Sequence, residues 1–121
     1  MSFTSKVLVT GGAGFIGSNL ADGLIREGAK VIILDNFLTG FRENLVEIDG
    51  DFELIEGDIT DLGDVKRAIE GCEVIFHQAA LPSVPRSVED PIETHRICVD
   101  GTMNLLIAAR DAGHQEQPVV R

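Results

Sequence analysis

Three glycines in residues 10–17 could hold a pyrophosphate with backbone groups alone. They are Gly11, Gly14 and Gly17, within the segment TGGAGFIG. In this spacing one glycine permits a tight turn, the middle one lets a pyrophosphate approach the backbone, and the last lets a helix pack close to a strand. The free N–H groups at the start of that helix would face the phosphates, and the helix dipole would favour the negative charge. The same glycines would also suit a strand-to-helix turn without a ligand.

A carboxylate follows the second apolar run of the sequence. The run VIIL ends at Asp35, where an acidic side chain can accept hydrogen bonds from both hydroxyls of an adenosine ribose. Charged hydrogen bonds of this kind contribute roughly 1.5–3 kcal/mol each. Asp35 would repel the additional 2′-phosphate of NADP, so the sequence favours NAD. Arg42 is a nearby cation that weakens this argument, and Asp35 as an ordinary turn residue is the alternative.

A third candidate contact follows the next apolar run, at Gly57, Asp58 and Ile59. The end of such a strand can cover the adenine, with Asp58 accepting from its amino group and Ile59 packing on the ring. Gly-Asp is also an ordinary turn sequence, so the alternative here is a turn without a ligand.

These residues require a scaffold, and the hydrophobic pattern predicts one in which strands and helices alternate. We expect strands at residues 6–10, 30–34, 52–55 and 73–77, with the start of a fifth at 118–121. We expect helices that end at Gly28, Gly71 and Gly113, together with a short one at 42–48. Apolar strands between helices imply a parallel sheet covered on both faces. Right-handed crossovers then give an α/β, doubly wound sheet, truncated after the fourth strand or at the start of the fifth.

The longest predicted helix opens at Asp90, because Asp at the N-cap followed by Pro91 and Glu93 is favoured there. Its larger apolar residues fall roughly on one face, which we expect to be the buried one. These residues are Ile92, Val99, Met103 and Leu106.

Composition narrows the class of protein. The 121 residues suit one domain, 1–121, and 44% of them are hydrophobic, enough for a core. The formal charge of −10 argues against nucleic-acid binding, which needs a basic surface. We find no membrane-spanning run and no signal peptide at the N-terminus. Cys72 and Cys98 do not form a metal-binding pair, so we expect buried free thiols, no metal site and a cytoplasmic protein.

The glycine segment and five others resemble the NAD-dependent epimerase/dehydratase family. This family belongs to the extended short-chain dehydrogenase/reductases, acts on nucleotide sugars and includes the UDP-glucose 4-epimerases. The other segments that carry the resemblance are LDNFLTG at 34–40, GDITD at 57–61, HQAA at 77–80, SVPRSVEDP at 83–91 and DGTMNLLIAAR at 100–110.

The resemblance implies a Rossmann-type domain with NAD as its cofactor. It implies that three residues, Ser83, Val84 and Pro85, approach the sugar of the substrate. The residues that it places along the cofactor are Gly11, Gly14, Phe15, Ile16, Gly17, Asp35, Asn36, Phe37, Gly40, Asp58, Ile59, Ala79, Ala80 and Leu81.

Two departures from the family pattern bear on catalysis. Cys98 stands where the family's central helix carries an Asn that helps to organise the active site, and a thiol is a poorer donor and acceptor. The family also uses a Tyr as its acid/base within a YxxxK motif, and this sequence has no Tyr. We therefore expect the N-terminal NAD-binding portion of a protein whose family reaction moves a hydride from the sugar to NAD and back. The isolated chain would not be catalytic, and a nucleotide sugar would bind only with the missing C-terminal part.

Two other functions compete with this interpretation. The chain could be a non-enzymatic module that binds a dinucleotide or serves in assembly. A sheet that stops at its fourth strand has an unpaired edge, which predicts a homo-oligomer. A Rossmann domain for FAD or S-adenosylmethionine is the other alternative, and the GxxGxxG spacing and LDNFLTG disfavour it.

Overall fold

The computed structural model describes residues 6–37, 40–78, 92, 99–112 and 119–120. They form a parallel sheet of five strands in the order β3-β2-β1-β4-β5. The elements along the chain are β1 (Lys6–Thr10), α1 (Phe15–Arg26), β2 (Lys30–Asp35), α2 (Arg42–Val46), β3 (Glu53–Glu56), α3 (Leu62–Ile69), β4 (Val74–His77), α6 (Gly101–Ala112) and β5 (Val119–Val120).

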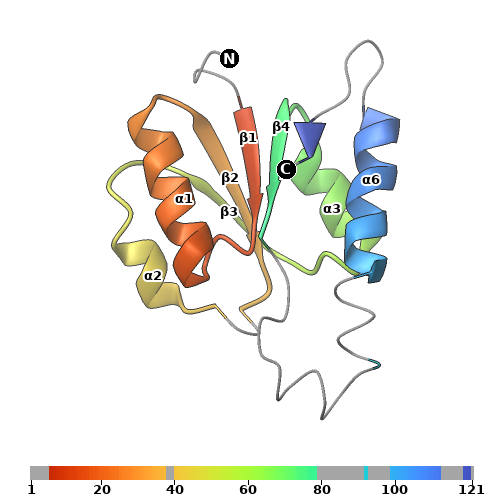
Figure 1. Ribbon diagram of the computed structural model, residues 1–121, viewed down its shortest axis with the longest axis horizontal. Helices are drawn as coiled ribbons and strands as arrows, with labels where there is room; N and C mark the ends of the chain where they lie inside the picture. The colour runs from red at the N-terminus through yellow and green to blue at the C-terminus, as the bar shows by residue number, and fades with distance from the viewer. Residues whose placement is uncertain (1–5, 38–39, 79–91, 93–98, 113–118, 121) are drawn as a thin grey trace.

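Helices cover both faces of the sheet. Figure 1 shows α1 and α2 on one side of the strands and α3 and α6 on the other. The chain therefore winds outward from β1 in both directions, and the strand order reverses between β1 and β4. This arrangement confirms the predicted α/β, doubly wound sheet.

Side chains that alternate along the strands pack into two separate hydrophobic cores, one on each face of the sheet. Leu8 on β1 and Ile75 on β4 belong to the core beneath α3 and α6, and both are fully buried. Val7 and Val9 point the other way, into the core beneath α1. Burial on both faces explains why β1 and β2 read as continuous apolar runs in the sequence.

Two predicted helix termini, the end of α1 and the start of α3, show the expected capping, whereas the predicted end at Gly113 lies outside the described residues. After α1, the N–H of Gly28 donates to Ile25 and that of Ala29 donates to Leu24, with Gly28 at a φ of 94°. This is the Schellman pattern, which favours glycine because it needs a left-handed residue. At the start of α3 the side chain of Asp61 accepts from the N–H of Asp64 at 3.2 Å, as an N-cap should.

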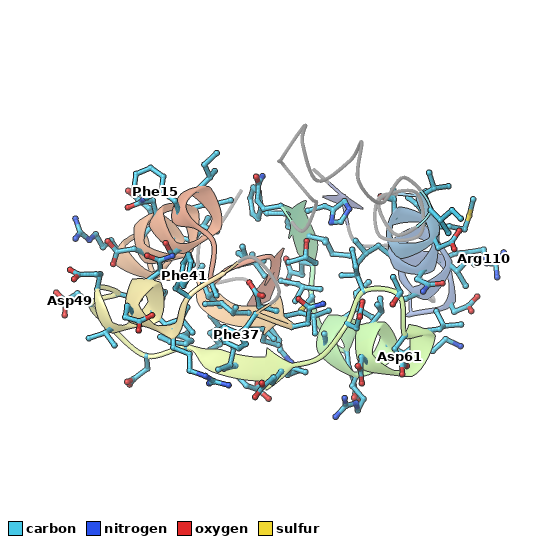
Figure 2. The ribbon with its side chains drawn as sticks, turned by 90° about the horizontal axis from the view of Figure 1, so that it is seen from below. Phe15, Phe37, Phe41, Asp49, Asp61 and Arg110 are labelled. Atoms are coloured by element: carbon cyan, nitrogen blue, oxygen red, sulfur yellow. The ribbon has the colours of Figure 1, made fainter. Side chains whose placement is uncertain are left out.

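The strand register brings the carboxyl ends of four strands to one edge. Thr10 is the partner of both Leu34 and His77, and Asp35 is the partner of Glu56. Figure 2 is turned to view the molecule from below, which is the side of this edge in Figure 1. In open α/β sheets, ligands bind outside the carboxyl ends of the strands, at the point where the strand order reverses.

The predicted buried face of the last helix is wrong. Ile92 is 81% exposed, and Val99, Met103 and Leu106 are about half exposed. The helix instead buries a face built largely of small residues, Gly101, Leu105, Ala108 and Ala109. A Cβ at Gly101 would lie 2.4 Å from Cδ1 of Ile59, so this glycine lets α6 begin close to the loop after β3. Periodicity alone assigns the bulky residues to the core.

Several element boundaries differ from the expected ones by one or two residues. β3 is shifted by one residue to Glu53–Glu56, and α2 ends at Val46 rather than at residue 48. The premise of an unpaired β4 edge is also wrong, because β5 pairs with β4 at Val74 and Ile75. The expected opening of the last helix at Asp90 lies outside the described residues.

Candidate functional site

The glycine segment forms a tight turn between β1 and α1. Gly11 has a φ of 70°, which favours glycine, and its N–H donates to the carbonyl of Leu34 at 2.8 Å. A Cβ added at Gly17 would lie 2.2 Å from the carbonyl oxygen of Gly11. This glycine therefore lets α1 lie close to the turn, whereas the sequence predicted that it would let the helix pack close to the strand.

The first turn of α1 is suited to an anion. Its N-cap, Gly14, makes no side-chain capping hydrogen bond, and the turn contains no acidic residue. The first N–H groups of a helix have no partner within the helix, and the dipole adds a partial positive charge. Phe15 and Ile16 are 77% and 68% exposed. Figure 1 shows that α1 begins at the lower side of the sheet, where the strands end.

Asp35 ties the end of β2 to the glycine turn. Its Oδ2 accepts from the N–H of Ala13 at 2.9 Å, and its Oδ1 accepts from the N–H of Phe37 at 2.7 Å. The residue is only 8% exposed. A carboxylate oxygen can accept more than one hydrogen bond, so both oxygens retain capacity for a hydroxyl. The contact of Asp35 with a ribose stays a prediction.

Asn44 is a further residue at the turn, and the sequence reasoning missed it. Its Nδ2 donates to the carbonyl of Ala13 at 2.8 Å, and the N–H of Phe41 donates to the same oxygen at 3.0 Å. A Cβ at Gly40 would lie 2.8 Å from Cβ of Ala13. The start of α2 therefore packs directly on the turn. No local signal in the sequence marks a contact between residues so distant along the chain.

Asp58 closes the loop after β3. Its Oδ1 accepts from both the N–H and the hydroxyl of Thr60, at 2.9 and 2.7 Å. Its Oδ2 lies 3.4 Å from Nδ2 of Asn36, which joins the loops that follow β2 and β3. The backbone N–H of Asp58 donates to Asp64 at 3.0 Å, and this bond, with a contact to Arg67, lowers the pKa of Asp64. Asn36 and Asp58 thus lie together, and their contact with an adenosine stays a prediction.

Ile59, unlike Asp58 before it, is buried in the core. It is 5% exposed, and a Cβ at Gly101 would lie 2.4 Å from its Cδ1. Its carbonyl accepts from Nδ2 of Asn104 at 2.9 Å. The side chain therefore supports the start of α6, and the packing of an adenine ring on Ile59 stays a prediction.

His77 links the two strands on either side of the point where the strand order reverses. Its Nδ1 lies 2.7 Å from the hydroxyl of Thr10, and its Nε2 lies 3.0 Å from the hydroxyl of Thr102 on α6. Burial lowers the pKa of His77, so the ring is neutral near pH 7. A neutral imidazole has one donor and one acceptor nitrogen, which matches two hydroxyl partners. His77 thus fastens α6 to the end of β1.

Several predicted residues lie outside the described part of the chain. They are Ala79, Ala80, Leu81, Ser83, Val84, Pro85 and Cys98. In the part that is described, no three His, Cys, Asp or Glu residues gather as a metal site would require. No helix there is long and apolar enough to cross a membrane.

Comparison with known proteins identifies relatives of this chain. A putative UDP-glucose 4-epimerase of Methanocaldococcus jannaschii is 46% identical over 101 residues, which are 83% of this chain and 32% of that protein. The UDP-glucose 4-epimerase of Thermus thermophilus, solved in complex with NAD, is 42% identical with a TM-score of 0.81 and matches 89% of this chain and 34% of its own. A dTDP-glucose 4,6-dehydratase of Streptomyces venezuelae with NAD bound is 40% identical with a TM-score of 0.82, over 89% of this chain and 36% of its own.

The chain spans about a third of the length of these relatives. The model of one family, described as the NAD dependent epimerase/dehydratase family, matches residues 7–120. The motifs, the strand order and the glycine turn agree with this match. The chain belongs to the NAD dependent epimerase/dehydratase family.

Proposed function

We propose that these residues bind NAD at the carboxyl edge of the sheet, as the N-terminal cofactor-binding portion of a nucleotide-sugar epimerase or dehydratase. The observation that carries the proposal is the position of Asp35. Its buried carboxylate is hydrogen-bonded into the glycine turn, beside a helix that starts without a side-chain cap. The NAD-bound relatives support the same cofactor here.

Each part of NAD would meet a different part of the edge. The N–H groups that open α1, at Phe15, Ile16 and Gly17, would hold the pyrophosphate, and Gly14 leaves room for it. The ribose hydroxyls would donate to Asp35. Asp58 would accept from the adenine. When bound, NAD supplies an acceptor for a hydride from the sugar.

The remaining site predictions extend this proposal. Asn36, Phe37 and Gly40 would line the adenosine end, and 79–81 would follow the cofactor toward the nicotinamide. Residues 83–85 would approach the nucleotide sugar, which we expect to bind only with the further residues that the relatives possess. Because this sequence has no Tyr, we propose that the 121 residues alone bind NAD without turnover.

Calorimetric titration of the purified chain with NAD, NADP and UDP-sugars tests the proposal. We expect NAD to bind with a measurable heat, NADP to bind more weakly, and the UDP-sugars not to bind. The absence of heat with NAD would contradict the proposal. Epimerisation by the chain alone would contradict the claim that it lacks turnover.

A non-enzymatic module is the second candidate, and it would share the NAD site. Assembly is its other expected role, but β5 pairs with β4 at Val74 and Ile75, so the free β4 edge that suggested assembly is not present. Self-association and a cytoplasmic location stay predictions. Sedimentation of a monomer alone at micromolar concentration would contradict self-association.

A further inference from the structure

Arg42 is a cation close to the proposed adenosine site, and its guanidinium group is engaged by an ion pair at one edge and by an aromatic ring on one face. Its Nη2 lies 2.9 Å from Oε2 of Glu56, and its Cζ lies 4.2 Å from the centre of the Phe37 ring. Arg42 is the first residue of α2, whereas Glu56 is the last residue of β3. The ion pair therefore joins the two elements that follow β2 in the sequence.

Phe37 connects this pair to Asp35. The N–H of Phe37 donates to Oδ1 of Asp35 at 2.7 Å, and Phe37 has a φ of 60°, which is uncommon for a residue with a side chain. The hydrogen bond holds the backbone of Phe37 just beyond the end of β2. Figure 2 labels Phe37. Phe37 thus contacts Asp35 through its backbone N–H and Arg42 through its ring.

Glu56 also lies beside Asp35. The two residues are register partners on adjacent parallel strands, which are about 4.8 Å apart. Partners in a parallel pair project to the same face of the sheet, here the face that carries α1 and α2. A 2′-phosphate on the ribose would therefore meet two carboxylates and one arginine that is already paired.

We propose that Glu56 is a specificity-determining residue that favours NAD over NADP by engaging Arg42. The inference rests on the proposed NAD site. A guanidinium group is the side chain best suited to a phosphate, because it can donate two parallel hydrogen bonds. Paired with Glu56 and stacked on Phe37, Arg42 offers a 2′-phosphate little net positive charge. Without Glu56, the same arginine would turn from a neutralised group into a phosphate ligand.

Glu56 acts on nucleotide preference by holding Arg42. The test must therefore separate this effect from the mere removal of one negative charge. The variants are Glu56→Gln, Arg42→Gln and the double variant. Glu53→Gln is the matched control, because Glu53 is an exposed residue of the same strand and the substitution removes the same charge. Glu56 is 59% exposed, so its replacement by the isosteric amide leaves the core intact. Calorimetry gives the ratio of the Kd for NADP to the Kd for NAD for each protein.

We expect Glu56→Gln to lower this ratio by up to about fivefold, the upper end of the range for one exposed charge pair. Glu53→Gln should leave the ratio unchanged, and the double variant should restore the wild-type ratio because no arginine remains to bind the 2′-phosphate. An unchanged ratio in Glu56→Gln, with NAD still bound, would overturn the role of Glu56 alone. A ratio that stays low in the double variant would overturn the action through Arg42. Failure of the wild-type chain to bind NAD would overturn the proposed function, and this inference with it.

Discussion

The carboxylate of Asp35 accepts a hydrogen bond from the backbone N–H of Ala13 at 2.9 Å, and this contact joins the end of β2 to the centre of the glycine turn. The same side chain holds Phe37 through its other oxygen. Asp35 therefore shapes the proposed site before any ribose is present. Its substitution should affect stability and nucleotide preference together.

Asp35→Ala should lower the free energy of unfolding by about 1–3 kcal/mol, because it leaves two backbone N–H groups without their acceptor. It should also weaken NAD more than NADP, since the repulsion of the 2′-phosphate disappears with the carboxylate. Urea unfolding and calorimetry measure the two effects. Asp51→Ala, at an exposed position, is the control. Equal losses for NAD and NADP would remove the ribose role from Asp35.

Gly17→Ala and Gly23→Ala form a matched pair within α1. A Cβ at Gly17 would collide with the carbonyl oxygen of Gly11, whereas a Cβ at Gly23 meets nothing within 4 Å. We expect Gly17→Ala to cost about 1–3 kcal/mol through overpacking and to abolish NAD binding. Gly23→Ala should stabilise the protein by about 0.5–1 kcal/mol, because alanine loses less backbone freedom in a helix. Similar unfolding midpoints for the two variants would show that the helix does not need its close approach to the turn.

His77 should make stability depend on pH. Burial lowers its pKa in the folded protein, so the unfolded chain binds a proton more readily. Stability is then complete above about pH 6.5, the ordinary value of histidine, and is lost as the pH falls through the lowered folded pKa. Urea unfolding at pH 7.5 and 5.5 should show a larger decrease for the wild type than for His77→Gln. The lowered pKa of Asp64 changes the stability of the protein only in more acidic solution, below the ordinary value of 3.8, and so does not affect this comparison. An equal decrease in both proteins would contradict the buried neutral histidine.

Cys72 should resist alkylation. Its Sγ lies 3.4 Å from the carbonyl of Ala68, and desolvation raises the pKa of the thiol to about 11. The thiolate is the reactive form, so its fraction falls about a hundredfold relative to a thiol of pKa 9.0. In a Cys98→Ser background, iodoacetamide at pH 8 should label Cys72 slowly in the folded protein and rapidly in urea. Rapid labelling of the folded protein would show that Cys72 is accessible.

The sequence predicted those features that depend on local pattern. Asp35 was identified because it ends an apolar run, and Asp61 because a cap follows a simple residue preference. The contacts of Asn44 with Ala13 and of His77 with Thr102 join distant residues, and no local pattern encodes them. Periodicity assigns the wrong face of α6 to the core because it counts only bulky residues. The close packing of α6 against Ile59 requires a residue without a side chain, which is Gly101.

The glycine turn and Asp35 together make one central claim, that this edge of the sheet binds NAD. Calorimetric titration of the wild-type chain and of Asp35→Ala with NAD and NADP tests it most directly. The account predicts that the wild type binds NAD more tightly than NADP and that Asp35→Ala loses most of this preference. A wild-type chain that binds neither nucleotide, or that binds both equally, would contradict it.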